Sequence, residues 1–342
     1  MSAQLQSEAA FESGLLGFIN RQWFKYRRPL PAGTSLEGQT AIVTGANSGL
    51  GLEASRQFLQ LGLSTLIIAV RSVGKGDAAA KPLREAFPNA NIEVWTLDMV
   101  SYDSIQGFAA RCHELERIDI VILNAGIQTS QYTIVEATGH EQVLQVNYLS
   151  TALLSLLLLP ILRSKRQNPS HPPVLCTVTS DMAYWSSLQT KGPVLAQLDR
   201  KEGYSTVRQY MGTKLLEMMF VTKLAEQVNA DEVIVNMVSP GWCSGTAIGG
   251  ESPGGESLLF RGLKALATRS VEVGGSTYID ATVVQGKTSH GSFCSDWTLR
   301  PFSYPPLLYT DDGLQVRERL WEETMEELNF AGASKIVQDL VN

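Results

Sequence analysis

The sequence predicts an α/β protein with a doubly wound, mostly parallel sheet of about seven strands. Short apolar runs rich in β-branched residues recur along the chain, and stretches with helical periodicity separate them. Several of these runs are apolar at every position, which is typical of strands covered by helices on both faces. Sheets of this class bind ligands at the carboxyl ends of their strands. We therefore expect the functional residues just after the strands.

The expected strands can be assigned in chain order from Thr40 onward. Helical spacers between successive runs favour crossover connections, and therefore parallel neighbours. Two segments that follow strands, about 181–209 and 242–270, have less regular patterns and are expected to form lid segments above the site. The six strand runs are 40–44, 65–70, 91–97, 118–124, 174–179 and 232–238.

The 342 residues are expected to form one catalytic domain, residues 36–342, preceded by a helical arm, residues 1–35. No linker rich in proline, glycine and serine divides the α/β alternation. The arm has an amphipathic pattern that ends at Pro29 and Pro31. We expect it to pack on the outside of the domain. Contact of its aromatic and basic side chains with a membrane or a partner is the alternative.

Composition and charge exclude several classes of protein. Hydrophobic residues make up 44% of the chain, which suits a globular core, and the net charge of −6 gives no basic stripe for nucleic acid. The four cysteines are widely spaced, which favours free or buried thiols over disulfides. The four histidines lack metal-ligand spacing, and there is no GxSxG elbow, so neither a metal site nor a serine hydrolase is predicted.

The amino terminus does not resemble a secretory signal, because it is polar and carries Glu8. The longest apolar stretch, 149–162, contains polar residues and Pro160, and is shorter than the roughly 20 residues that a membrane span needs. It predicts a buried helix and no transmembrane segment. We expect a cytoplasmic protein.

A glycine-rich turn follows the first expected strand and leads into an amphipathic helix. Glycines permit a tight turn and a close backbone approach to a pyrophosphate, whose charge the helix N-terminus favours. The position between strand and helix is what makes this cluster informative. The predicted cofactor-binding residues of this turn are Gly45, Asn47, Ser48, Gly49, Leu50 and Gly51.

Arg71 stands directly after the second expected strand, where an NAD-preferring site usually has an acidic residue. A guanidinium can pair with the 2′-phosphate of NADP, whereas a carboxylate would repel it. The sequence therefore predicts NADP(H) in preference to NAD(H).

The third and fourth expected strands end in further cofactor-binding candidates. Asp98, followed by Met99, can accept a hydrogen bond from the adenine amino group. Asn124 is followed by the small residues Ala125 and Gly126, which let the backbone lie beside a cofactor. Because these strand ends belong to one sheet, they are expected to meet in one crevice.

The predicted reactive group combines Tyr210 and Lys214 on one helix with Ser180 at the end of the fifth strand and Asn147 on an earlier helix. Residues four apart share a helix face, so a Lys214 ammonium is expected to lower the pKa of Tyr210 from about 10 toward the working range. Tyr210 could then protonate a carbonyl oxygen or deprotonate an alcohol. Ser180 would bind the same oxygen, and Asn147 would hold a water that links Lys214 to solvent.

Taken together, these motifs resemble the short-chain dehydrogenase/reductase family over roughly residues 38–300. TGANSGLG, the LD at residue 98, LNAG, Val146-Asn147, VTS at residue 180 and YMGTK occur in the family's order. The resemblance implies a Rossmann fold, a nicotinamide dinucleotide and the Asn147, Ser180, Tyr210, Lys214 tetrad. The arm, AVRSVGKG and the tail near Trp321 are similar to fungal relatives of retinol-dehydrogenase-like enzymes, many of which tailor natural products.

The sequence departs from the family pattern in two places. After Pro240 and Gly241, which the resemblance assigns to the cofactor site, the threonine comes one position late. Either Ser244 or Thr246 is therefore expected to meet the nicotinamide amide. The 29 residues between Ser180 and Tyr210 also exceed the spacing in compact members, which predicts an enlarged pocket wall.

Large apolar residues near the reactive group predict a bulky, apolar ketone or alcohol substrate. The alternative is that several of them fill the core. These residues are Met182, Tyr184, Trp185, Met211 and Trp242.

We expect NADPH-dependent carbonyl reduction, or oxidation of the matching alcohol. The main alternative is a nucleotide-binding member of the same family with non-redox activity, such as an isomerase or cyclase, or with a pure binding role. A homodimer is expected if the helix after Asn147 and the Tyr210 helix form the shared bundle that the resemblance suggests.

Overall fold

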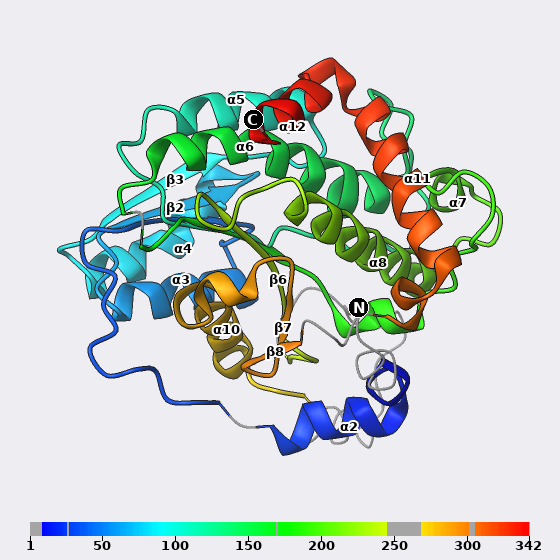
Figure 1. Ribbon diagram of the computed structural model, residues 1–342. Coiled ribbons are helices and arrows are strands. Elements are labelled where there is room, and N and C mark those ends of the chain that lie inside the picture. Colours follow the sequence, from blue (N-terminus) through cyan, green and yellow to red (C-terminus); the bar gives the residue numbers. More distant parts are fainter. Residues whose placement is uncertain (1–8, 26, 169, 245–267, 301–304, 342) are drawn as a thin grey trace.

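The sheet of this protein has eight strands in the order β3-β2-β1-β4-β5-β6-β7-β8 (Figure 1). The computed structural model describes residues 9–25, 27–168, 170–244, 268–300 and 305–341. All neighbouring strands are parallel except β7 and β8, which are antiparallel. The strands are β1 (Thr40–Thr44), β2 (Thr65–Val70), β3 (Asn91–Thr96), β4 (Ile120–Leu123), β5 (Val174–Val178), β6 (Ile234–Ser239), β7 (Phe293–Ser295) and β8 (Thr298–Arg300).

The doubly wound architecture is confirmed, and all six predicted strand runs form strands whose ends lie within two residues of the prediction. The estimate of about seven strands is one too low because β8 folds back on β7 as an antiparallel edge. The chain order reverses at β1, which pairs with β2 on one side and β4 on the other. The crevice of a doubly wound sheet opens at this switch point.

Helices cover both faces of the sheet and give it two hydrophobic cores. Within β1, Ala41 and Val43 belong to one core and Ile42 to the other, as the alternation of side chains along a strand requires. The first core is closed by α3 (Gly49–Gln60), α4 (Val73–Ala86) and α10 (Val271–Ile279), and the second by α5 (Tyr102–Cys112), α6 (Ser150–Lys165) and α8 (Thr206–Ala225).

One continuous helix, Leu144–Lys165, starts with the π-helical turn η1 (Leu144–Leu149) and continues as α6. Its 22 residues are long and apolar enough to cross a membrane, so the expectation from residues 149–162 underestimated its length. The predicted burial is confirmed, since 89% of its apolar window lies inside the fold. Its apolarity is therefore explained by its place between α5, α8 and the sheet.

Two C-terminal helices, α11 (Asp311–Glu327) and α12 (Ala333–Val341), pack against α8 and α6 (Figure 1). Trp321 stacks on Phe220 with ring centroids 5.6 Å apart. The hydroxyls of Tyr148 and Thr324 are 2.6 Å apart in the interior of this contact. The face of α6 and α8 that was expected to form a dimer bundle is therefore covered by the chain's own helices.

The arm contains α2 (Leu15–Phe24), which lies beside the loops at the carboxyl ends of β5 and β6 (Figure 1). Most of its basic side chains are exposed, but Arg21 is buried. Within the arm, which we expected to pack on the outside of the domain, Arg21 points inward and is held by acidic partners.

The remaining described elements are short. The expected lid segment 181–209 contains two of them, and Val194, Leu195 and Leu198 within it belong to the core beside α8 and α11. These elements are η2 (Asp181–Trp185), α7 (Ala196–Asp199), η3 (Asp280–Val284), η4 (Gly286–Ser289), η5 (Pro306–Tyr309) and η6 (Asn329–Ala331).

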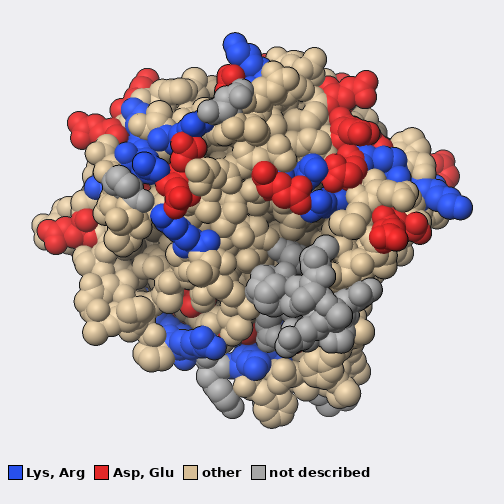
Figure 2. Space-filling view, in the orientation of Figure 1, with Lys and Arg blue, Asp and Glu red and all other residues tan. Residues whose placement is uncertain are grey.

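The surface and the thiols agree with the composition. On the face that Figure 2 shows, basic side chains lie among acidic ones and do not form a continuous stripe. All four cysteines are free and buried, as the spacing predicts.

Candidate active site

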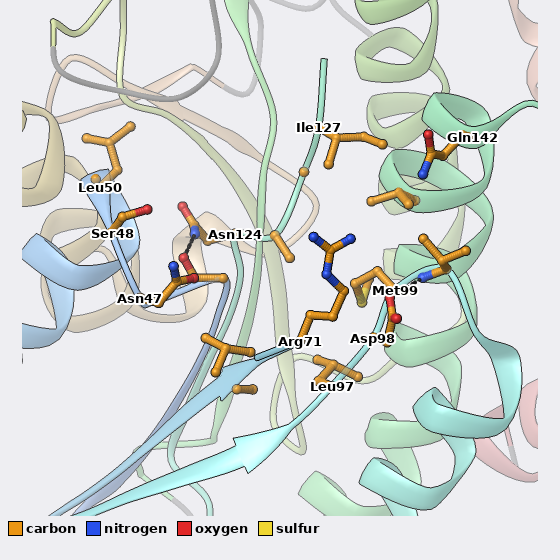
Figure 3. A pocket seen from close by; sticks show the side chains of 18 residues that line it. Asn47, Ser48, Leu50, Arg71, Leu97, Asp98, Met99, Asn124, Ile127 and Gln142 are labelled. Carbon is orange, nitrogen blue, oxygen red and sulfur yellow. Dashed lines mark hydrogen bonds between the residues drawn. The ribbon is translucent and has the colours of Figure 1, made fainter. Parts of the chain in front are cut away.

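A cavity of about 280 Å³ opens at the carboxyl ends of β1 to β4, where the chain order reverses (Figure 3). Its lining brings together the predicted residues of four separate strand ends. These are Gly45, Asn47, Ser48, Gly49, Leu50, Arg71, Asp98, Met99, Asn124, Ala125 and Gly126. The lining also includes Val100, Ile127, Gln142 and Val146, which the sequence reasoning missed.

The glycine turn has the backbone geometry that its residue types allow. Gly45 and Gly49 have φ values of +66° and +58°, in the region that favours glycine. A Cβ added at Gly51 would lie 2.6 Å from Asn124 Nδ2, so no larger residue fits without movement. Because α3 begins at Gly49, its N-terminus meets the cavity and provides a site for an anion.

Thr44 fixes the fourth strand end against this turn. Its Oγ1 accepts hydrogen bonds from the backbone N–H groups of Asn124 and Ala125, both at 2.9 Å. The Asn124 side chain donates to the Thr44 carbonyl at 2.8 Å and accepts from the Tyr278 hydroxyl at 3.0 Å. Neither Thr44 nor Tyr278 was singled out from the sequence, because a strand threonine and a helix tyrosine carry no distinguishing pattern.

Arg71 lies one residue after β2, and its side chain extends across the middle of the cavity (Figure 3). It is exposed, and none of the described residues pairs with its guanidinium. Next to it, Asp98 is held by hydrogen bonds to the following residues: its Oδ1 accepts from Val100 N at 3.0 Å, and its N–H donates to Ser104 Oγ at 2.9 Å (Figure 3). The cavity thus offers a free cation beside a fixed carboxylate.

Ser180 and Tyr210 are not among the residues that line this cavity, but Tyr210 is close to Lys214, which lies near Gly126 of the cavity wall. Ser180 is the N-cap of η2, and its Oγ accepts from Met182 N at 3.2 Å. Tyr210, on α8, lies close enough to Ser180 for the serine hydroxyl to favour its phenolate form and so lower its pKa. Two side chains that are 30 positions apart in the sequence are thus close together in the fold.

The pKa of Tyr210 is raised above its usual value near 10, so the prediction of a lowered pKa is wrong for the chain described here. Burial is the main cause, because it penalises the phenolate. The Lys214 ammonium and the Ser180 hydroxyl act in the opposite direction but do not outweigh burial, and the Glu217 carboxylate raises the pKa further. Tyr210 is thus held as a neutral phenol, which is a proton donor.

Lys214 is buried and occupied by three acceptors. Its Nζ donates to the Val178 carbonyl at 2.9 Å and to both oxygens of Glu217, at 2.8 and 3.0 Å. Burial raises the pKa of Glu217 to about 7, although Lys214 opposes this shift. Glu217 was missed, yet its position three residues after Lys214 places both side chains on one face of α8.

Asn147 lies inside the π-helical turn, a backbone irregularity that is frequent at functional sites. Its side chain bonds the backbone of Ile127 in both directions: Oδ1 accepts at 2.8 Å and Nδ2 donates at 3.0 Å. A Cβ on Gly126 would lie 3.4 Å from Asn147 Oδ1 and 4.0 Å from Lys214 Nζ. Asn147 and Lys214 therefore lie beside the strand end at Gly126, and the Tyr210 ring lies 5.7 Å from Lys214 Nζ.

The loop after β6 is described only as far as Ser244. Pro240 and Gly241 lie at its start, and Ser244 N donates to the Arg269 carbonyl at 2.9 Å. Thr246 lies outside the described residues, so the choice between Ser244 and Thr246 stays open.

The predicted substrate-contact residues divide into two groups. Tyr184 belongs to the core, where its ring lies near Phe293, so the core interpretation holds for it. Met182 and Met211 are half-buried on η2 and α8, while Trp185 and Trp242 are exposed on the loops after β5 and β6.

The sequence has related proteins in other organisms. Residues 39–169 match the short chain dehydrogenase family. A short chain dehydrogenase of Hypocrea virens is 54% identical over 341 residues, covering 99% of each chain. A short chain dehydrogenase/reductase of Annulohypoxylon moriforme is 44% identical over 326 residues, covering 94% of each chain.

Solved structures share the fold at lower identity. The L-sorbose reductase of Gluconobacter frateurii, solved with NADPH and L-sorbose, has a TM-score of 0.56 and 21% identity, covering 76% of this chain and 95% of that one. The RhlG protein of Pseudomonas aeruginosa, solved with NADP, has a TM-score of 0.55 and 21% identity over 76% of this chain and 95% of that one.

Proposed function

This chain belongs to the short-chain dehydrogenase/reductase family of oxidoreductases, and on that basis we propose that it is an NADPH-dependent carbonyl reductase. The observation that carries the proposal is that Lys214 and Asn147 lie beside Gly126 of the cavity wall, with the Tyr210 ring 5.7 Å from Lys214 Nζ and Ser180 near Tyr210. This arrangement puts a neutral proton donor next to a second hydroxyl near a crevice suited to a dinucleotide.

The residues of the cavity suit a nicotinamide dinucleotide. The glycine turn leaves room for phosphates at the N-terminus of α3, since nothing lies within 4 Å of the place that a Cβ on Gly49 would take. When bound, the reduced nicotinamide supplies a hydride to the substrate carbon. Asp98 can accept from the adenine amino group, and Asn124 to Gly126 form the wall beside it.

The tetrad residues supply the matching proton transfer. Ser180 holds the substrate oxygen by a hydrogen bond, and Tyr210 donates its hydroxyl proton to that oxygen as negative charge develops on it. The raised pKa of Tyr210 keeps the phenol protonated near neutral pH, the state that reduction requires. Lys214 stabilises the phenolate that remains on Tyr210 after the proton transfer. Asn147 holds the backbone at Ile127 in place.

The free guanidinium of Arg71 supports a preference for NADP(H) over NAD(H). Its place in the middle of the cavity suits a forked pair with a 2′-phosphate (Figure 3). For the substrate, the exposed Trp185 and Trp242 and the half-buried Met182 and Met211 favour a bulky apolar carbonyl. Together with the fungal relatives, they favour a natural-product intermediate as the substrate. A cytoplasmic location stays a prediction.

The decisive experiment follows NADPH absorbance with a panel of bulky apolar ketones and aldehydes. Wild-type protein is expected to oxidise NADPH with at least one of them and to use NADH less well. Tyr210→Phe removes the proton donor and is expected to reduce kcat by about 10²-fold or more while NADPH still binds. Tyr204→Phe, on a loop tyrosine that bonds Thr129, is the matched control and should retain activity.

Two results would contradict this function. Undiminished turnover by Tyr210→Phe would remove Tyr210 from the chemistry. Product formed without any change in NADPH would favour a non-redox reaction, such as isomerisation or cyclisation. For the cofactor, Arg71→Gln is expected to lower the ratio of kcat/KM with NADPH to kcat/KM with NADH by about tenfold or more.

A further inference from the structure

Arg21 carries a charge from the N-terminal arm into the interior, where it is 2% exposed. Burying a guanidinium is costly unless acidic groups pair with it. Arg21 Nε donates to Asp181 Oδ2 at 2.8 Å, while Nη1 donates to the Glu12 carbonyl at 2.7 Å and pairs with the Glu12 carboxylate. Its guanidinium also lies 5.1 Å from the centre of the Tyr184 ring. Asp181, Glu12 and the Tyr184 ring thus surround the guanidinium.

Asp181 connects this buried charge to the reactive group, because it directly follows Ser180. Asp181 is only 7% exposed and is the first residue of η2, the turn that Ser180 caps. The turn cannot shift without separating an ion pair whose members lie 160 residues apart in sequence. The orientation of the Ser180 hydroxyl therefore depends on the arm.

Gln22, the next residue of α2, holds the opposite loop. Its side chain bonds the backbone of Trp242 in both directions, with Nε2 donating to the carbonyl at 2.9 Å and Oε1 accepting from N at 3.2 Å. Arg269 donates to the Arg21 carbonyl and, at 3.2 Å, to the Pro240 carbonyl. One turn of α2 thus spans the loops after β5 and β6.

A third contact extends this wall to the end of η2. Trp185 Nε1 donates to the Ser13 carbonyl at 2.7 Å, and the Trp185 ring meets Phe18 at a centroid distance of 5.8 Å. The arm is therefore tied to both ends of η2 and to the loop that carries Trp242.

From these contacts we propose that Arg21 is a positioning residue for Ser180, and that the arm is a fixed wall of the substrate site. The proposal rests on the proposed function, in which Ser180 holds the substrate oxygen. Arg21 acts through Asp181, so its loss leaves the dinucleotide cavity intact but lets the Ser180 turn move. Misplacement of a substrate-binding group by about 1 Å can lower a rate by about 10²-fold.

The test compares Arg21→Met, Arg21→Lys and Asp181→Asn with the control Arg317→Met, which removes a more exposed arginine ion pair, between α11 and Glu226 at the C-cap of α8. Hydrogen–deuterium exchange is followed in the peptide spanning residues 180–186 and in the glycine turn. Thermal unfolding identifies variants that fail to fold, and Arg21→Lys and Asp181→Asn remain as milder changes if Arg21→Met is one of them. NADPH affinity and kcat are measured with the best carbonyl substrate of the wild type.

We expect exchange at 180–186 to rise at least fivefold in Arg21→Met, with the glycine turn unchanged. The kcat value should fall by about 10- to 100-fold with NADPH affinity within twofold, and Arg21→Lys should recover part of the rate. Unchanged exchange at 180–186 in every folded Arg21 and Asp181 variant, or an equal loss of kcat in Arg317→Met, would overturn the proposal. Wild-type protein that reduces no carbonyl would instead contradict the proposed function, while the exchange data would still report on the arm.

Discussion

Glu217 has a direct effect on the proton donor, although it lies outside the tetrad. Its carboxylate binds the Lys214 ammonium through both oxygens, so it offsets the charge that would otherwise favour the Tyr210 phenolate. The pKa of Glu217 is about 7, so the carboxyl is largely protonated below pH 7 and charged above it. As pH rises through neutrality and Glu217 becomes charged, the stabilisation of the Tyr210 phenolate by Lys214 should therefore weaken.

Glu217→Gln removes this opposing charge but keeps a hydrogen-bonding group beside Lys214. Because Glu217 raises the pKa of Tyr210, the substitution is expected to lower it. The rising limb of kcat/KM for alcohol oxidation should then move to lower pH, as should the falling limb for carbonyl reduction. Glu226→Gln, on the same helix but paired with Lys223 and Arg317, serves as the control. Identical pH profiles for wild type and Glu217→Gln would contradict this role.

At the scale of elements, His140 joins three segments that are separate in the chain. His140 lies shortly before η1, the helix that carries Asn147. Its Nδ1 lies 2.7 Å from Asp199 of α7, and its Nε2 lies 3.1 Å from Glu327 of α11. Burial opposes the charged form, but the two carboxylates prevail and raise the pKa of His140 to about 9. The imidazolium therefore persists through neutral pH and links the wall after Ser180 to the C-terminal helices.

This linkage predicts a loss of stability in mildly alkaline solution. A group whose folded pKa is raised contributes fully below its unfolded pKa near 6.5, and the contribution disappears as pH rises through about 9. After allowance for solvent screening, the amount is about 1–2 kcal/mol. Urea unfolding between pH 6 and 10 should show this decline in wild type and in His113→Gln, an exposed control. If the free energy of unfolding declines by the same amount in His140→Gln, groups other than His140 cause the decline.

The sequence predicted the central elements well because each leaves a local signal. Strands β1 to β6 are apolar runs four to six residues long, whereas β7 and β8 are three residues each and too short for a readable alternation. The Tyr210–Lys214 pair and the glycine turn follow from residue type and spacing along single elements, whereas Ser180 and Asn147 follow from the order of the motifs along the chain. Glu217 had such a signal, at three residues from Lys214, and could have been found.

The pairing of Arg21 with Asp181 could not be predicted in the same way. The two residues are 160 positions apart, and Arg21 stands in a basic cluster that a solvated helix face explains equally well. The direction of the Tyr210 pKa shift was also beyond the sequence, because burial and the Glu217 charge depend on tertiary packing.

At the scale of the whole molecule, α11 and α12 change which surface is available for assembly. They cover the face of α6 and α8 that a shared dimer bundle would need, and they bury Trp321 against Phe220 there. Ion pairs at the margin, such as Lys223 with Glu318, close the contact. The expected homodimer through this face is therefore incompatible with the position of α11 and α12.

We expect the protein to run at its monomer mass of 37.4 kDa in light scattering. Trp321→Ala should destabilise it by about 2–4 kcal/mol, because a large ring is lost from this contact, while the exposed Glu322→Ala should have little effect. Removal of residues 311–342 should expose apolar side chains of α6 and α8 and lead to self-association. If the wild type is a dimer and the truncated protein is a monomer, the C-terminal helices promote assembly instead.

The contacts of the arm also bear on the order in which the chain is completed during synthesis. Arg21 emerges early from the ribosome, yet Asp181 follows 160 residues later and Arg269 is 248 residues away. At about 5–20 residues per second, the arm waits roughly ten seconds or more for its acidic partner. The arm is thus made well before the residues on which it docks, and a nascent chain with a finished glycine turn still lacks the wall that holds Ser180.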